Sequence, residues 1–290
     1  LDLSGHTAHN LLPVFAFKPA PVQASWLGYW ATTGLREIDY VIADPLCLPP
    51  SLEPHFVEKP WHLPVRYCLT PPPEAPAISE LPAASRGHIT FGCFQAFPKI
   101  TDATLSLWSK ILAACEGSIL RVQNSHLSHD VNRSPFLRRL QGAGISQARV
   151  ELAGATPRSR YLSDLSLVDI NLDTFPYTGG TTTCEALWMG VPTISQFGDS
   201  MLERQGLSIL SCAGLRDWTA ASSDDYVALA ISKARDLNAL AHTRRSLRER
   251  VAKTPLFDAN AFSRLLVDAL FAMWRAHAPG DPGQHESKGN

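Results

Sequence analysis

Several patterns that would identify a function directly are missing from this sequence. It contains no CxxC pair, no Asp-x-Asp pair, and neither of the glycine patterns GxGxxG and GxxxxGK[ST]. Their absence argues against a zinc site of the usual spacing, a carboxylate pair holding Mg²⁺ or Mn²⁺ on phosphates, a dinucleotide fingerprint and a P-loop. If a phosphate binds here, backbone amides and cationic side chains must hold it, and we expect no metal and no cofactor.

The sequence also lacks a charge bias, a long apolar run and clustered cysteines. Its net charge of -1 at pH 7 argues against nucleic acid as a partner. No apolar run is long enough to cross a bilayer, so we expect no membrane partner. The six scattered cysteines are typical of buried free thiols in a reducing compartment, and they favour a cytoplasmic protein.

Length and composition are those of an ordinary folded protein. The chain has 290 residues, of which 45% are hydrophobic and 18% charged, enough for one large or two medium domains. Its first residues, Leu1–His6, resemble a strand end entering a loop, without an initiating Met. We therefore expect it to be the C-terminal part of a longer protein.

The most informative stretch runs from Val168 to Ser195. The apolar and turn-forming residues alternate there as they do in a βαβ unit. The pattern predicts a strand, a glycine-bearing loop, a helix ended by Gly190 and a second strand, at Val168–Asp173, 175–180, Thr181–Met189 and Val191–Ser195. Such a unit points free backbone amides and the positive end of a helix dipole at one spot, which suits a phosphate.

Two interpretations of Thr182 and Glu185 remain open from their spacing. They fit a capping box, in which the Thr side chain bonds an amide of the first turn and the Glu reaches back. Alternatively, Thr181 and Thr182 hold a diphosphate while Glu185 accepts hydrogen bonds from a ribose. The spacing alone does not decide between a structural and a binding role.

Strands and helices alternate regularly before this stretch, which favours a parallel, doubly wound sheet. Ligands of such sheets bind beyond the carboxyl ends of the strands. The predicted strands are Val22–Leu27, Tyr40–Asp44, Ile89–Phe94, Ser118–Gln123 and Arg149–Leu152, and the predicted helices are Thr101–Cys115, Pro135–Gln141, Arg158–Leu167 and Ala261–Trp274. The loops at the carboxyl edge are then Gln95–Ile100, Gly154–Arg158 and Phe175–Thr182. The proline-rich residues 45–82 are predicted to be an irregular connection.

These loops contain the candidate residues for chemistry. Lys99 is the one cation of its loop, and Arg158 begins a predicted helix. Fixed positive charges beside a helix N-terminus would stabilise a departing diphosphate, although surface Lys and Arg side chains are more often simply solvated. His6, close to Asp2 in an N-terminal loop, is a further acid–base candidate, with solvation as the simpler explanation.

Five motifs together resemble the catalytic region of the O-linked N-acetylglucosamine transferase / SPINDLY family. They are DLSGHT at Asp2–Thr7, KPAPVQASWLGY at Lys18–Tyr29, FQAFPKI at Phe94–Ile100, NLDTFPYTGGTTTCEALWMGVPTIS at Asn171–Ser195, and LFDANAFSRLLVDALFAMW at Leu256–Trp274. The resemblance implies an α/β GT-B fold, with two Rossmann-like domains facing across a cleft. It also implies that a sugar moves from a nucleotide donor to Ser or Thr of proteins, with inversion and without a metal.

The resemblance assigns roles residue by residue. It places the phosphate-binding lysine on Lys99 and the ribose-binding acid on Glu185. The diphosphate turn falls on Gly179, Gly180, Thr181 and Thr182, and the segment near the base falls on Thr156, Pro157 and Arg158, with Tyr161 stacking on the base and Ala96 also at the donor. His6 would lie near the sugar at best.

The sequence departs from the family at four places that concern the donor and its surroundings. Trp30-Ala31-Thr32 replaces a Pro-Gly-Thr, Gly180 replaces a His, Ala96 a Gln and Asp164 an Arg. We expect transfer of N-acetylglucosamine from UDP-N-acetylglucosamine to Ser or Thr. The alternatives are a GDP-fucose-dependent protein O-fucosyltransferase of the SPINDLY type and a catalytically weak nucleotide-sugar-binding module.

The resemblance also implies a division of the chain. Residues 1–82 would be the remainder of an N-terminal domain with its connection, and residues 83–255 a nucleotide-sugar-binding domain. Residues 256–277 would be a helix returning to the N-terminal domain, and residues 278–290 a flexible tail. Further N-terminal strands, tetratricopeptide repeats and one active-site His would precede Leu1, and the protein is expected to need that part as a partner.

Overall fold

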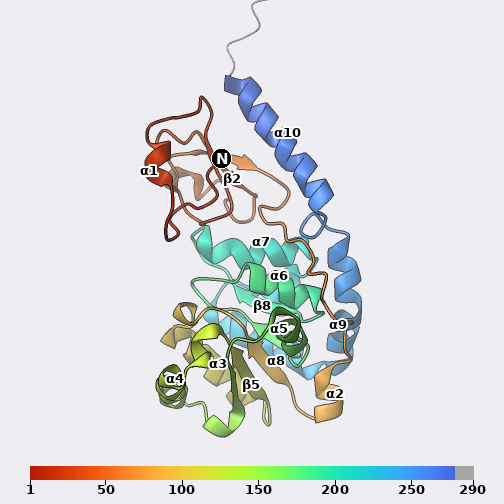
Figure 1. The fold of residues 1–290 in the computed structure, drawn as a ribbon. Coiled ribbons are helices and arrows are strands. Elements are labelled where there is room, and N and C mark those ends of the chain that lie inside the picture. The colour runs from red at the N-terminus through yellow and green to blue at the C-terminus, as the bar shows by residue number, and fades with distance from the viewer. Residues whose placement is uncertain (278–290) are drawn as a thin grey trace, which may run out of the picture.

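The computed structural model describes residues 1–277, which form two parallel β-sheets with helices around them (Figure 1). The smaller sheet has the strand order β1-β2-β3. Its strands are β1 (Ala24–Ser25), β2 (Tyr40–Ala43) and β3 (Lys59–His62). Asp2 extends it at one edge through a parallel bridge to Ser25. We call residues 1–66 around this sheet the N-terminal body.

The larger sheet has the strand order β6-β5-β4-β7-β8-β9, and all its pairs are parallel. The strands are β4 (Thr90–Cys93), β5 (Ile119–Gln123), β6 (Val150–Ala153), β7 (Ile170–Leu172), β8 (Thr193–Gln196) and β9 (Thr219–Ala220). The chain moves outward from β4 to β6 and then returns to the other side of β4 with β7. The strand order therefore reverses between β4 and β7, where open α/β sheets bind ligands. We call residues 83–255 around this sheet the C-terminal body.

The helices of the described residues are α1 (Leu12–Phe15), α2 (Pro82–Arg86), α3 (Asp102–Ala114), α4 (Asp130–Gly142), α5 (Arg158–Leu165), α6 (Thr181–Trp188), α7 (Gln205–Cys212), α8 (Ser223–Arg235), α9 (Leu237–Ala252) and α10 (Ala259–His277). α3 shows how the sequence specifies them. The Thr101 side chain caps it by accepting from Thr104 N, and Leu105, Trp108 and Ile111 are buried on one face. No helix of residues 1–277 is long and apolar enough to cross a membrane.

Two predictions about elements are wrong. The proline-rich stretch is not wholly irregular, because it contains β3. Pro60 is tolerated there since β3 is an edge strand paired only with β2, and an edge strand has backbone positions that need no N–H. α4 begins at Asp130 rather than Pro135; the ring of Pro135 removes one helical hydrogen bond, and its would-be acceptor Val131 is exposed to solvent.

The six cysteines are all free thiols; Cys47, Cys93 and Cys184 are buried, as expected, whereas the other three are only half-buried. Burial of apolar side chains also joins the two bodies. Ala24 and Ile42 of the smaller sheet belong to the same buried cluster as the strands of the larger sheet.

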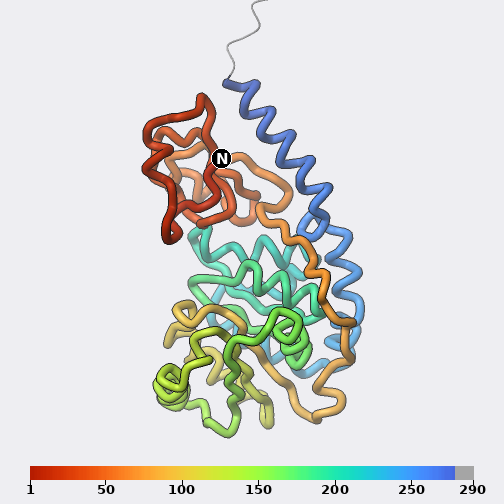
Figure 2. The backbone as a smooth tube through the Cα atoms, viewed as in Figure 1, coloured from red at the N-terminus to blue at the C-terminus, as the bar shows by residue number. Residues whose placement is uncertain are grey.

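The C-terminal helices connect the C-terminal body back to the N-terminal body. In Figure 1, α10 extends along the end of the molecule that contains β2 and the N-terminus. Phe262 of α10 stacks on Trp26, with ring centroids 5.5 Å apart and planes inclined by 22°. Figure 2 shows the connection after residue 66 running beside the last helices, and Leu69 N donates to Leu256 O over 2.9 Å. Residues 278–290, predicted as a flexible tail, lie outside the described residues.

Candidate active site

The candidate site forms where the loops after β4 and β7 meet. β4 and β7 are neighbouring parallel strands, so their carboxyl ends lie at the same edge of the sheet. The loop after β4 carries Lys99, and the loop after β7 carries Tyr177, Thr178 and Gly179 and ends at α6. Two of the predicted loops are thus brought together by strand order.

A buried carboxylate, Asp173, holds the loop after β7 in place through hydrogen bonds. Asp173 Oδ1 accepts hydrogen bonds from Gly179 N (2.8 Å) and Thr174 N (2.9 Å), and Asp173 Oδ2 accepts one from Ser195 Oγ (2.7 Å). Burial raises the pKa of Asp173 to about 6, although these hydrogen bonds oppose the shift. The carboxylate holds the loop so that Gly179 and Gly180 lie directly before the helix.

Lys99 lies against this loop. Its Nζ donates to Thr178 O over 3.0 Å and lies 3.8 Å from the centre of the Tyr177 ring. Gln205 Nε2 also donates to Thr178 O, over 3.3 Å. Burial lowers the pKa of Lys99, and the charge of Asp173 opposes that change. The ammonium is therefore held in one place by a carbonyl and an aromatic face.

The N-terminus of α6 presents unsatisfied donors beside Lys99. Gly180 is its N-cap and no side chain caps the helix, so its first amides have no side-chain partner. The buried Thr183 Oγ1 also lacks a hydrogen-bond partner among the described residues. A Cβ on Gly179 would collide with the Gln95 amide and the Thr183 hydroxyl, so any larger residue there would require both side chains to move. The arrangement suits a bound anion.

The capping-box interpretation of Thr182 and Glu185 is wrong. Because Gly180 is the N-cap, Thr182 lies inside the helix and Glu185 is too far along it to reach back to the cap. Glu185 is buried instead, and its Oε1 accepts from Arg158 Nη1 over 2.6 Å. Its position is set by a partner from α5 rather than by the start of its own helix.

Arg158 and Tyr161 of α5 surround Glu185. Arg158 is exposed and also approaches Glu74 Oε1 of the connection, at 3.4 Å. Tyr161 lies beside Glu185 and meets Phe94 edge-on at 5.7 Å. Burial and then the charge of Glu185 raise the pKa of Tyr161 well above its usual value, so this phenol stays protonated. Three residues predicted to contact the nucleoside are therefore neighbours.

The remaining donor-site predictions lie around these groups. Thr156 Oγ1 accepts from Gln123 Nε2 over 3.1 Å, and the same amide donates to the buried Asp164 over 2.9 Å. Pro157 is the N-cap of α5 and is exposed. Ala96 is exposed, at the start of the short turn that carries Lys99.

His6 is not in direct contact with the other predicted site residues. It is exposed in the N-terminal body, its Nε2 lies 3.0 Å from Thr32 O, and its ring meets Tyr29 edge-on at 5.8 Å. Burial raises the pKa of Tyr177, and Tyr29 lies close enough to raise it as well. Two tyrosines thus lie between His6 and Lys99.

Sequence reasoning missed several residues of this site. Asp173 and Tyr177 stand in the stretch that the sequence singled out, at a strand end and in the following loop, and that placement was a usable signal. Tyr67, whose hydroxyl lies 2.5 Å from Thr181 Oγ1, stands in the proline-rich stretch. Nothing in the local pattern marks Tyr67.

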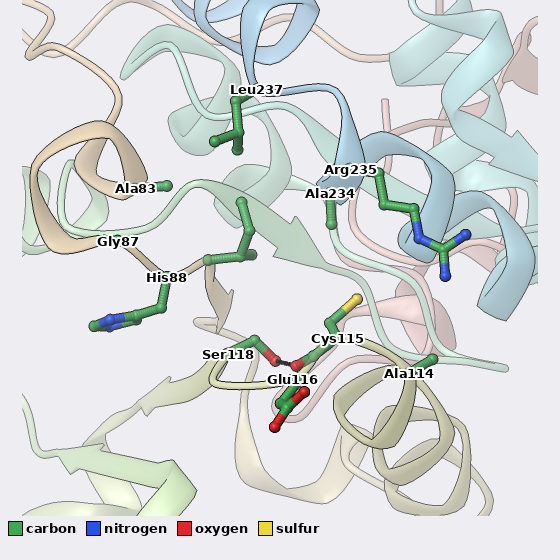
Figure 3. A pocket seen from close by; sticks show the side chains of 11 residues that line it. Ala83, Gly87, His88, Ala114, Cys115, Glu116, Ser118, Ala234, Arg235 and Leu237 are labelled. Atoms are coloured by element: carbon green, nitrogen blue, oxygen red, sulfur yellow. Dashed lines mark hydrogen bonds between the residues drawn. The ribbon is translucent and has the colours of Figure 1, made fainter.

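A well-formed cavity elsewhere contains none of the predicted residues (Figure 3). It has a volume of about 360 Å³ and is lined mainly by small and apolar residues, with His88, Glu116 and Arg235 among them. Ile89 and Ser118 of its lining directly precede β4 and β5. The cavity therefore lies at the amino ends of the strands, opposite the candidate site.

Comparison with known sequences identifies relatives along nearly the whole chain. The model of glycosyl transferase family 41 matches residues 1–70 and 80–266. A Petunia hybrida protein described as a probable UDP-N-acetylglucosamine–peptide N-acetylglucosaminyltransferase SPINDLY is 43% identical over 283 residues, 97% of this chain and 30% of the relative. An Arabidopsis thaliana protein of the same description, named SEC, is 27% identical over 98% of this chain. The chain spans about 30% of the length of these relatives.

Solved structures agree with the architecture. A mutant of the Thermobaculum terrenum O-GlcNAc transferase superposes with a TM-score of 0.89 at 36% identity, over 95% of this chain and 52% of that one. Anabaena HepE, solved with UDP and glucose, superposes with a TM-score of 0.55 at 11% identity, over 83% of this chain and 65% of that one, a likeness of fold alone. Both have the GT-B fold, and the predicted α/β GT-B fold is confirmed.

Proposed function

The chain belongs to glycosyl transferase family 41, and we propose that its protein is an inverting, metal-independent glycosyltransferase that moves N-acetylglucosamine from UDP-N-acetylglucosamine to Ser or Thr of proteins. One observation carries the proposal. The Lys99 ammonium lies beside the uncapped N-terminus of α6, against the loop after β7 that Asp173 holds in place. The names of the relatives, which are described as UDP-N-acetylglucosamine–peptide transferases, support the donor and the peptide acceptor.

The mechanism follows from where negative charge develops. The acceptor hydroxyl attacks the anomeric carbon from the face opposite the diphosphate and loses its proton to water, while the bond from that carbon to the diphosphate oxygen breaks. The diphosphate leaves with added charge, which Lys99 and the first amides of α6 would stabilise as fixed donors at that spot. Carboxylates grouped as metal ligands are not needed, and residues 1–277 contain no group of three His, Cys, Asp or Glu side chains that could hold a metal.

The nucleoside would lie on the α5 side of this diphosphate. Glu185 would accept hydrogen bonds from the ribose, and Tyr161 would stack on the base beside Thr156, Pro157 and Arg158. His6 would approach the sugar from the N-terminal body, which would also present the acceptor. Which nucleobase the site accepts would then depend on the segment at Thr156, which is held by the hydrogen bonds from Gln123 to Thr156 and Asp164.

The test combines substitution of Lys99 with removal of metal. Lys99→Ala should lower the turnover of UDP-N-acetylglucosamine with a Ser/Thr peptide pool by on the order of 10²–10³ and leave the protein folded, because the lost charge acts mainly in the transition state. Lys110→Ala, which removes an exposed lysine of α3, is the matched control and should keep full turnover. EDTA should leave wild-type activity unchanged. Near-normal turnover in Lys99→Ala, or inactivation by EDTA, contradicts the mechanism.

A binding measurement separates the alternatives. Ligand at roughly 100 times its dissociation constant stabilises a protein by about 2.7 kcal/mol, which raises the melting temperature measurably. Stabilisation by UDP rather than GDP or ADP is expected; stabilisation by GDP alone would indicate the GDP-fucose-dependent alternative. Binding without turnover in the full-length protein would indicate a nucleotide-sugar-binding module.

A further inference from the structure

Tyr67 is a residue of the N-terminal side that reaches the candidate diphosphate site. It directly follows the N-terminal body, at the start of the connection, and its hydroxyl lies 2.5 Å from Thr181 Oγ1, 114 residues later in the sequence. Its ring is partly buried against both the main core and the smaller cluster that contains Trp30 and Met201. Packing on both sides therefore holds the hydroxyl at the first residue of α6.

The electrostatic surroundings of Tyr67 connect it with the nucleotide site. Burial, with a smaller contribution from the charge of Glu185, raises the pKa of Tyr67 to about 12. At neutral pH the phenol therefore carries its proton and can donate it. Thr181 is exposed, so its hydroxyl is accessible to a ligand while it is bonded to Tyr67.

We propose that Tyr67 is a positioning residue for the donor diphosphate: its hydroxyl donates to Thr181 Oγ1 and so directs the single hydroxyl hydrogen of Thr181 toward a phosphate oxygen. A threonine hydroxyl has one hydrogen and two lone pairs. Once Thr181 donates to phosphate, it can only accept from Tyr67, and hydrogen bonds in series strengthen one another. The inference rests on the proposed function, because it assumes that a diphosphate binds at α6.

A second consequence concerns the two sides of the molecule. Tyr67 follows the N-terminal body directly, whereas Thr181 belongs to the C-terminal body, so the bond exists only when the two are placed as in this structure. The diphosphate site is therefore completed by a group from outside the nucleotide-binding sheet. Its affinity depends on the placement of the N-terminal body as well as on α6.

The experiment compares UDP with uridine, which lacks the phosphates. Tyr67→Phe keeps the packed ring and removes only the hydroxyl, so it should weaken UDP binding by about three- to ten-fold, the range of one neutral hydrogen bond. Uridine binding, followed by ligand-observed NMR, should not change. Tyr40→Phe is the control, since Tyr40 meets Trp61 edge-on in the smaller sheet and contacts none of the site residues described above; it should leave both affinities unchanged. If the wild-type protein binds GDP rather than UDP, the same comparison is made with GDP and guanosine in place of UDP and uridine.

A double-mutant cycle tests the route through Thr181. Thr181→Ala should also weaken UDP, and Tyr67→Phe combined with Thr181→Ala should be little weaker than Thr181→Ala alone, because the two hydroxyls act through one contact. Unchanged UDP binding in Tyr67→Phe, equal weakening of UDP and uridine, or additive losses in the double variant would overturn the inference while leaving the proposed function standing. Wild type that binds neither UDP nor GDP would overturn the proposed function, and the inference with it.

Discussion

Glu185 illustrates how a single residue takes its role from a distant partner. Its carboxylate is buried, and its contact to Arg158 reaches a helix that precedes it by a whole strand–loop unit. A buried carboxylate needs such a partner, since an unpaired charge away from water is strongly unfavourable. The same residue is placed beside Tyr161 and Tyr67, at the junction proposed for ribose and diphosphate.

We predict that Glu185→Gln weakens UDP binding by roughly three- to thirty-fold. The glutamine amide keeps the shape of the side chain but loses the charge that strengthens a hydrogen bond to ribose. Titration calorimetry measures the affinity. Glu249→Gln, which removes an exposed carboxylate paired with Lys253 on α9, is the control and should bind like wild type. Wild-type affinity in Glu185→Gln would mean that the carboxylate serves only to pair with Arg158.

Asp173 gives a second residue-scale prediction, about pH. The pKa of Asp173 is about 6 in the folded protein against 3.8 in the unfolded chain. Between these values the unfolded state loses its proton first, so stability falls as pH rises from about 4 to about 6 and then levels off. Asp173→Asn cannot titrate there. The unfolding free energy of wild type minus that of Asp173→Asn should fall by about 3 kcal/mol over this range, at 1.36 kcal/mol per pK unit.

Urea unfolding at a series of fixed pH values measures this difference. A difference that stays constant with pH would show that the hydrogen bonds of Asp173 balance its burial, and one that grows as pH rises would show that they outweigh it. The loop before α6 would then rest on an ionised carboxylate over the whole range.

At the scale of elements, α9 fastens the connection between the bodies to the larger sheet. Arg244 is fully buried, and its guanidinium donates to the carbonyl oxygens of Ser79 (2.9 Å), Val168 (2.7 Å) and Ser166 (2.7 Å). Burial lowers the pKa of Arg244 to about 10, which leaves it charged at neutral pH. One side chain thus joins α9, the connection and the loop before β7, which leads to the candidate site.

Arg244→Met should therefore lower the unfolding free energy by about 3–5 kcal/mol, because it removes the donor of several buried carbonyls at once. Its neighbour Arg245 is exposed and lies 3.8 Å from Glu80. Arg245→Met should change the unfolding free energy by no more than about 0.5 kcal/mol. Chemical denaturation of the two variants and wild type measures these unfolding free energies. Similar decreases in both variants would show that the buried hydrogen bonds of Arg244 add no stability.

At the scale of the whole molecule, the two bodies share buried polar contacts as well as a core. Asp44 of the N-terminal body is buried and accepts from Ser208 Oγ of α7 over 2.6 Å, as well as from Arg66 N over 2.9 Å. Arg204 of the C-terminal body donates to Leu46 O over 2.7 Å. Because apolar clusters and hydrogen bonds both cross between the bodies, we expect them to unfold together.

Ser208→Ala should destabilise the protein by about 1.5–3 kcal/mol, as loss of a hydrogen bond to a charged group does. Ser211→Ala in the same helix is the control, since Ser211 has only a 3.5 Å contact to Arg216 and should change little. Calorimetry should show a single transition in all three proteins. Two separate transitions in wild type would contradict the shared core.

Local pattern determined much of this protein. The strand, loop, helix and strand within residues 168–195 follow from apolar periodicity and from Gly190, which are properties of neighbouring residues. The parallel-sheet rule then placed the loops of Lys99 and Thr178 at one edge, and the structure brings these residues into contact. The GT-B fold followed from motifs spread along the chain.

The tertiary structure alone decided which side chains meet. No local pattern pairs Glu185 with Arg158, brings Tyr67 to Thr181 or makes an edge strand around Pro60. Thr182 and Glu185 even had the spacing of a cap that the helix does not use. The reason is physical: periodicity and turn propensity act over a few residues, whereas a contact across more than a hundred residues depends on how packed strands and helices bring separate segments together.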